Sequence, residues 1–399
     1  MMKLTYFDIR DIFRTPRLAL SGKKIWVHTL GLAIGWGIYT VLTYLALILN
    51  GQTVTEIWNT FHFFPCLFMT TLPVAWYAWL VSGVGIVLWV ILFLEASLAV
   101  SRITYKQLKG DEFFSSGDSV KYIKKHGTAV VMGPISILLI IAFFVVCAII
   151  AAWIAKWPVL DILILGLPYL LYFIVSTFVV YSAAVFVVSF VLSPAIVGTA
   201  EEDTMETVFQ SYSTLWAQPW RLALYETIVV GLSGIATFIY GWALIFGYKF
   251  FNCIFGAPWL MNGKMARIVE QASSYLFGVN SPLNPMISRF FCYSTNASLS
   301  MTKPLFLTTT DVITIILITV ALFVIAASVV AYFFCNITAG QSIIYIILRK
   351  KKDDENLIER KDEDELAEEE KNKKEEEEKT SESSAETEEK SEVKPEETK

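Results

Sequence analysis

Two glutamates stand inside long apolar stretches of this chain, where an ionisable side chain is a candidate for function. Glu95 lies near the end of one stretch and Glu226 near the start of another. Ionisable groups are costly within a bilayer, so those found there commonly bind ions, relay protons or hold a lipid head group. With Arg102 and Arg221 close by in the sequence, the two glutamates could share one polar cluster. The alternative, which we favour because neither glutamate is central in its stretch, is that both reach the interface or pair with a nearby arginine as structural contacts.

The sequence lacks the patterns typical of enzymes and metal sites. Its histidines, His28, His62 and His126, fall in separate segments, and its five cysteines show no CxxC spacing. It contains neither a GxxxxGK[ST] phosphate loop nor a GxGxxG pattern after a strand. We therefore expect a protein without enzymatic activity, metal or cofactor.

The elements that position these residues are transmembrane helices. Of the 399 residues, 55% are apolar and only 17% are charged. A bilayer core about 30 Å thick needs roughly 20 apolar residues as helix, since no backbone polar group can stay unpaired there. The sequence predicts an all-α fold, a polytopic transmembrane helix bundle with six spans. These are Ile25–Leu49, Pro73–Val100, Thr128–Ala155, Tyr169–Leu192, Leu222–Tyr248 and Val312–Ile337.

Apolar character also fills Val159–Leu167, ahead of the fourth span. Pro158, Gly166 and Pro168 interrupt this stretch. We interpret it as a short re-entrant or interfacial piece. The alternative is two spans in a tight hairpin, which would raise the count to seven.

The distribution of lysine and arginine predicts the orientation, because cytoplasmic loops keep the positive charge. Basic residues cluster before the first span, after the second and after the last, whereas Asn50–Leu72 has none. Six spans with both termini in the cytoplasm satisfy this pattern, and seven would place the basic C-terminal stop on the wrong side. We expect a multi-pass protein of the cytoplasmic (inner) membrane.

The segments flanking the spans differ in character. Residues 1–24 form an amphipathic segment in which Tyr6 to Phe13 alternate at helical spacing before Pro16. This helix would lie in the plane of the cytoplasmic leaflet or pack on the protein's own loops. The six-span domain covers residues 25–348. Residues 349–399 carry 13 basic and 22 acidic side chains, a composition that predicts a disordered cytoplasmic tail. The rest of the chain is only slightly basic, so no nucleic-acid partner is expected.

The loop 249–310 is the largest extracytoplasmic feature. Its segment Met261–Phe277 alternates apolar and charged residues, which predicts a surface helix across the outer mouth of the bundle. Cys253 and Cys292 flank this helix. An extracytoplasmic location permits a disulfide between them, and two free thiols are the alternative.

Small residues within two spans indicate close helix packing. Gly31, Gly35 and Gly37 lie in the first span, and Gly83 and Gly85 in the second. Gly31 and Gly35 make a GxxxG pattern, which lets two helix backbones approach.

The segment after the fourth span resembles a known family. It runs from Ser193-Pro194 through Glu201-Glu202 to Gln210, and then to Pro219-Trp220-Arg221. Over about residues 193–224 this order is similar to the membrane domain of bacterial glycerophosphodiester phosphodiesterases. The resemblance implies a compact six-span bundle with an in-plane cytoplasmic helix at Glu206–Ala217. It implies no activity, because those membrane domains have none agreed.

The sequence therefore favours a non-enzymatic accessory or scaffold subunit, which packs in the lipid bilayer against other membrane protein subunits. The alternative is a transporter or lipid-handling protein that uses Glu95 and Glu226.

Overall fold

The computed structural model describes residue 4 and residues 6–70, 73–157, 159–261, 264–277, 308–362 and 365–366. All regular secondary structure in these ranges is helical. Six helices are long and apolar enough to cross a membrane, as predicted. They are α3 (Gly22–Leu49), α5 (Trp76–Lys109), α6 (Ser116–Ile154), α7 (Tyr169–Ala200), α9 (Pro219–Phe255) and α13 (Thr309–Asp353). The chain is a polytopic membrane protein.

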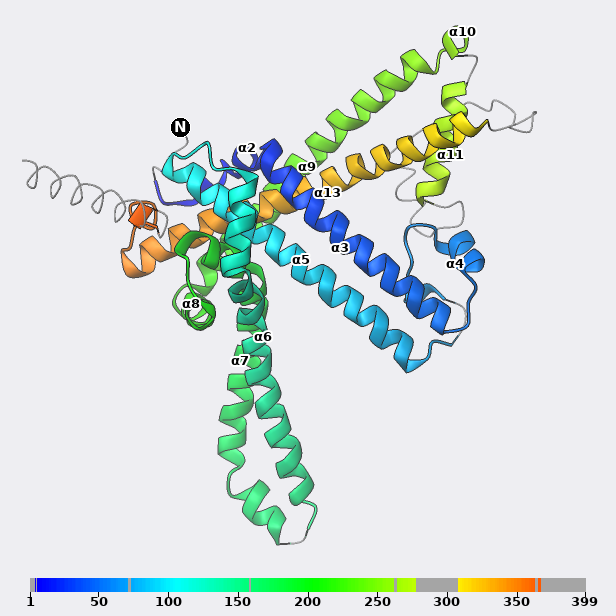
Figure 1. The fold of residues 1–399 in the computed structure, drawn as a ribbon. Helices are drawn as coiled ribbons and strands as arrows, with labels where there is room; N and C mark the ends of the chain where they lie inside the picture. Colours follow the sequence, from blue (N-terminus) through cyan, green and yellow to red (C-terminus); the bar gives the residue numbers. More distant parts are fainter. Residues whose placement is uncertain are drawn as a thin grey trace, which may run out of the picture.

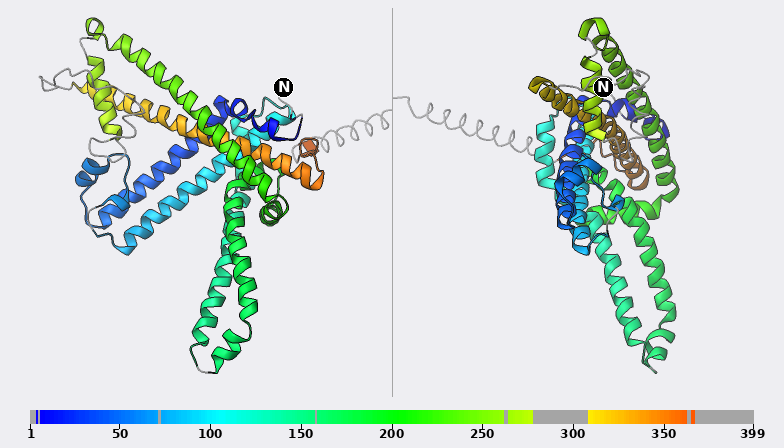
Figure 2. Two further views of the ribbon diagram at one scale, coloured as in Figure 1. Left: turned by 180° about the vertical axis from the view of Figure 1, so that it is seen from behind. Right: turned by 90° about the vertical axis from the view of Figure 1, so that its right-hand side faces the viewer.

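The six helices form three antiparallel pairs, here called arms, which diverge from a common base (Figures 1 and 2). α3 packs with α5, α6 with α7, and α9 with α13. In Figure 1 the α6–α7 arm points down, while the other two arms spread to the right. We call the outer ends of the arms the tips. By the orientation predicted above, the base faces the cytoplasm.

Several helices continue well past the predicted spans into the base: α6 begins at Ser116 instead of Thr128, and α7 ends at Ala200 instead of Leu192. α5 reaches Lys109 and α13 reaches Asp353, beyond the predicted ends at Val100 and Ile337. The predicted spans stop at Val100 and Ile337 because polar residues follow and lower the hydropathy. The helices persist because tertiary contacts in the base bury these turns, and such contacts supply most of a helix's stability.

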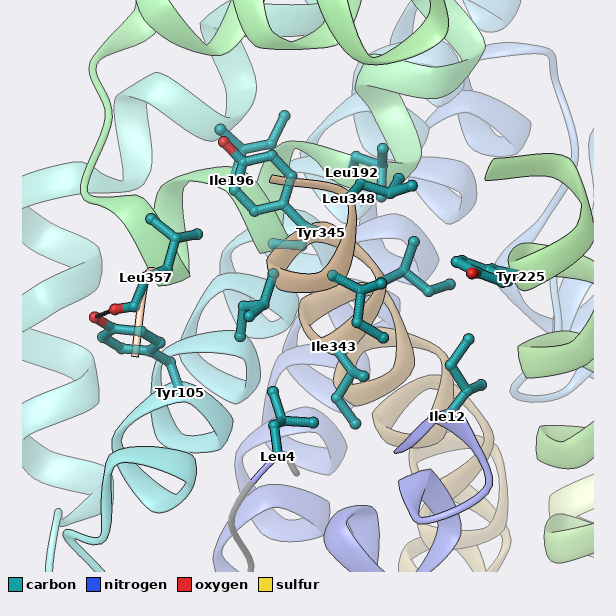
Figure 3. Close-up of a cluster of buried hydrophobic side chains, with 14 of the residues drawn as sticks. Leu4, Ile12, Tyr105, Leu192, Ile196, Tyr225, Ile343, Tyr345, Leu348 and Leu357 are labelled. Carbon is teal, nitrogen blue, oxygen red and sulfur yellow. Dashed lines mark hydrogen bonds between the residues drawn. The ribbon is translucent and has the colours of Figure 1, made fainter. Parts of the chain in front are cut away.

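The largest apolar core lies in the base and surrounds α13 (Figure 3). Every residue of α13 from Thr338 to Leu348 is buried. Around it pack Leu192 and Ile196 of α7 and Tyr225 of α9. Each fully buried aliphatic side chain contributes about 1.5–3 kcal/mol, so the base is the part that holds the arms together.

The N-terminal segment packs on this base. It forms two short helices, α1 (Ile9–Ile12) and α2 (Thr15–Ala19), instead of the one helix predicted before Pro16. The proline stands in the first turn of α2, where its missing N–H costs nothing. Ile12 and Leu18 are buried in the core. Of the two interpretations offered, packing on the protein itself is the one the structure supports.

Some of the glycines predicted to lie at close helix contacts do so between α3 and α5. A Cβ added at Gly31 would lie 2.6 Å from the Ala96 side chain, and one at Gly35 would lie 2.5 Å from Trp89. α3 and α5 therefore touch backbone to backbone along the GxxxG face. The prediction is wrong for Gly37 and Gly83, which face open space.

Shorter elements lie at the tips and connections. They are α4 (Val54–Phe61), a 3₁₀ turn (Leu67–Met69), a π-helical turn (Ile162–Gly166), α8 (Thr204–Ala217), α10 (Pro258–Met261) and α11 (Lys264–Phe277). The π-helical turn takes the place of the re-entrant piece, so the described chain forms six spans and not seven. α11 confirms the predicted surface helix and packs on α13 through Ile268 and Ala272.

The start of the predicted disordered tail is structured. α13 runs to Asp353, and the chain then turns back over the base with Leu357 fully buried. The tail predicted from residue 349 thus begins later than its composition indicates. Residues 367–399 lie outside the described part, and their disorder stays a prediction.

Candidate functional site

A cavity of about 560 Å³ lies beneath the base, where the three arms part. Five of the six long helices contribute to its walls, which are mostly apolar and aromatic. The lining residues include Trp89 and Phe93 of α5, Pro194 of α7, Val230 of α9 and Phe334 of α13. Its volume falls within the roughly 300–1,000 Å³ typical of small-molecule sites.

Glu226 supplies the only carboxylate among the residues that line this cavity. Its Oε1 is buried and has no hydrogen-bond partner within the described chain. The Gln341 side chain of α13 lies against the same carboxyl group. A buried acceptor without a partner costs free energy that a ligand donor would recover. Glu226 therefore brings a hydrogen-bond acceptor to the wall of the cavity.

A second cavity of about 580 Å³ adjoins the first and shares Leu32, Trp89, Val330 and Phe334 with it. It runs between the α3–α5 and α9–α13 arms. Phe64 and Leu276, from tip elements, also line it. Apart from Thr237, its lining side chains are apolar or aromatic. Together the two cavities make a crevice with one acidic end and a long apolar remainder.

Two basic side chains of α3 are fully buried, and one of them contacts a residue that lines the first cavity. His28 has its Nε2 3.3 Å from the Ser97 hydroxyl, and Ser97 lines the first cavity. Lys24, one turn earlier, donates to the Leu18 carbonyl at 2.9 Å. Sequence reasoning missed both because it began the span at Ile25 and tested histidines only as metal ligands. The signal was their i, i+4 spacing on one face of an apolar helix.

The arginine predicted to stand near Glu95 is bound elsewhere. Arg102 is fully buried, and its Nη2 lies 2.6 Å from Glu201 and 3.3 Å from Asp362. The Tyr122 ring covers the guanidinium at 4.5 Å. Glu201 ends α7 with φ 58°, a left-handed conformation that costs a non-glycine residue about 1–2 kcal/mol. The ion pair with Arg102 offsets that strain.

Arg102 is the first of three cations on one face of α5. Lys106 lies 2.7 Å from Asp362, and Lys109 lies 2.6 Å from Glu365. Both acids belong to the segment that follows α13. Only the fold brings them to α5, because they are more than 250 residues away in sequence.

The remaining candidate residues are dispersed. Glu95 packs against Gly127 of α6, where an added Cβ would lie 3.7 Å from Oε1. Arg221 is exposed and donates to Gln218 at 3.4 Å. In these contacts the two glutamates and two arginines do not join into the single cluster considered from sequence.

Only one cysteine of the predicted Cys253–Cys292 disulfide lies in the described part of the chain. Cys253 is an exposed free thiol, and Cys292 lies outside the described residues, so a bridge between them stays a prediction. Within the described ranges, no group of three or more His, Cys, Asp or Glu side chains is arranged to hold a metal.

Comparisons with protein-family models, curated proteins and solved structures found no match. α8 occupies the range expected for the in-plane helix, but the family resemblance itself stays a prediction. What the arrangement offers chemically is a hydrogen-bond acceptor at the end of an apolar crevice, and a separate row of cations at the base.

Proposed function

We propose that this protein is a non-enzymatic, lipid-handling membrane protein that binds an amphipathic lipid between its arms. The head group would lie at Glu226 and Gln341, and an acyl chain would follow the apolar cavity toward the tips. One observation carries the proposal: Glu226, which has a carboxyl oxygen without a hydrogen-bond partner in the described chain, lines a cavity whose walls are mostly apolar and aromatic.

The chemistry of the pocket restricts the head group. A carboxyl oxygen accepts hydrogen bonds, and when ionised it pairs with a cation. A lipid with a primary amine or several hydroxyl groups fits this end, whereas an acidic head group would be repelled.

The test is the lipid content of the full chain purified from native membranes in mild detergent. We expect mass spectrometry to find an amine- or hydroxyl-bearing lipid enriched over the bulk membrane. Glu226→Gln should lower the retention of an amine lipid about 10- to 100-fold, since a hydrogen bond to a charged group contributes about 1.5–3 kcal/mol. Glu95→Gln is the matched control and should change nothing. A wild-type lipid profile equal to that of the bulk membrane would contradict the proposal.

A second candidate function is a scaffold for partner subunits, and the α6–α7 arm favours it. No described residue of this arm between positions 138 and 181 is buried, although most of them are apolar. Cys147 is exposed within this stretch. A thiol cross-linker applied to native membranes should then trap one stoichiometric partner through Cys147, and Cys147→Ser should abolish the product. Recovery of the chain alone would rule out a partner at this face.

A further inference from the structure

The described chain beyond α13 crosses the base and reaches the cationic face of α5. We call residues 354–366 the strap and Arg102, Lys106 and Lys109 the basic row. The strap begins at Asp354, where a left-handed conformation ends α13. Leu357 enters the core, and the Tyr105 hydroxyl donates to its carbonyl at 2.8 Å (Figure 3).

A single carboxylate of the strap lies within 4 Å of all three cations of the basic row. Oδ2 of Asp362 lies 2.7 Å from Lys106, 3.3 Å from Arg102 and 3.8 Å from Lys109. The Asp362 side chain is only 2% exposed. Glu365 adds a second contact to Lys109. Three cations that surround one carboxylate oxygen form a place that an anion can occupy.

The basic row needs an anion whether or not the strap supplies it. Glu201 balances Arg102, but Lys109 is only 11% exposed and meets Asp362 and Glu365, both of which belong to the strap. A nearly buried cation left without an opposite charge is strongly destabilising. If the strap departs, another anion has to take its place.

The strap is held in a way that permits such an exchange. Leu357 is the one apolar side chain in its described part that is fully buried, a contribution of about 1.5–3 kcal/mol. Glu365 is 41% exposed, so its pair with Lys109 contributes about 1 kcal/mol or less. The contacts of the strap with the basic row itself are ionic, through Asp362 and Glu365, and a competing anion can replace these contacts.

The basic row begins at the level of lipid phosphates. At 1.5 Å per residue, Arg102, Lys106 and Lys109 lie about 3, 9 and 13 Å along the helix beyond Val100, the predicted end of the span. The head-group layer extends about 5–8 Å beyond each face of the hydrocarbon core. Arg102 therefore lies within this layer, and Lys106 lies at its outer edge.

We propose that the basic row is a binding site for the phosphate of an anionic phospholipid head group, and that Asp362 and Glu365 occupy the site while the strap is docked. The lipid and the strap compete, so binding of one releases the other. This site lies at the base and is separate from the crevice at Glu226.

Hydrogen exchange of the full wild-type chain tests the competition without any substitution. The chain is placed in nanodiscs of phosphatidylcholine alone or with phosphatidylglycerol. Amides of residues 354–362 should exchange several-fold faster with phosphatidylglycerol. Equal exchange in the two bilayers would overturn the proposal. Release of the strap by inorganic phosphate in phosphatidylcholine nanodiscs would overturn the assignment to a lipid.

Native mass spectrometry tests the site itself. Asp362→Asn with Glu365→Gln should raise the number of retained phosphatidylglycerol molecules about tenfold relative to wild type. Adding Lys106→Gln and Lys109→Gln should remove that gain. The matched control adds Lys351→Gln and Lys352→Gln, cations of the base whose partners lie outside the strap, and should preserve it. A gain that survives the loss of Lys106 and Lys109 would overturn the proposal.

Discussion

At the scale of single residues, burial decides what each ionisable side chain can do. Glu226 keeps an acceptor without a partner and faces a cavity. Arg102 is fully buried but is paired with two carboxylates. The first residue is placed to take a ligand, whereas the second already has its counter-ions.

Asp362 gives a pH dependence with a defined sign. Burial alone raises its pKa, but the hydrogen bond from Lys106 and the charges of Arg102 and Lys106 hold the pKa below the ordinary 3.8. A lowered pKa means that the ionised form is favoured in the docked state. Its contribution to docking is therefore complete above pH 3.8 and is lost as the pH falls through the lower docked value.

The expected result is constant protection of residues 354–362 in hydrogen exchange from pH 7 to pH 5, followed by loss below pH 4. Asp362→Asn should lower that protection at every pH, while Asp118→Asn, an acid at the start of α6, should leave it unchanged. Loss of protection near pH 6 in the wild type would show that another group controls the strap.

At the scale of elements, the arms are positioned by close contacts in the base. A Cβ added at Gly198 of α7 would lie 2.5 Å from the Ser101 hydroxyl oxygen and 3.2 Å from the Arg102 backbone nitrogen. The backbone nitrogen cannot rotate away as the end of a flexible side chain does. This crossing therefore fixes the distance between α5 and α7 at the level of the ion cluster.

Gly198→Ala should destabilise the protein by about 1–3 kcal/mol, because overpacking forces the two backbones apart. A lower melting temperature in detergent would measure this effect. Gly231→Ala on α9 is the matched control, since its added Cβ meets nothing within 4 Å, and it should have a neutral or slightly stabilising effect. Equal melting temperatures for the two variants would contradict the packing argument.

At the scale of the whole molecule, the base and the tips differ in charge as well as in packing. The basic row and the basic end of α13 lie at the base. The described part of Asn50–Leu72, which has no lysine or arginine, lies at a tip. The positive-inside rule therefore predicts one orientation for all three arms.

Single-cysteine variants in a cysteine-free chain measure this orientation. A membrane-impermeant maleimide should label Thr55→Cys at a tip in intact cells. It should label Glu112→Cys at the base only after permeabilisation. Labelling of the base position in intact cells would reverse the predicted topology.

The sequence by itself determined the six spans, their order and the surface helix in the loop after α9. These follow from one-dimensional requirements: a bilayer demands about 20 apolar residues per span, and an amphipathic period reveals an exposed helix face. Gly31 and Gly35 also identified a packing face. Each of these features depends on residues close together in the chain.

Only the tertiary structure decided which charges meet and where the cavity lies. Asp362 belongs to a segment whose composition indicates disorder, yet it reaches Lys106 because α5 and α13 end at the same base. Glu226 gains its role from side chains of four other helices that surround the same space. The physical reason is that ion pairs and cavities depend on how the arms converge, and hydropathy along the chain carries no information about that convergence.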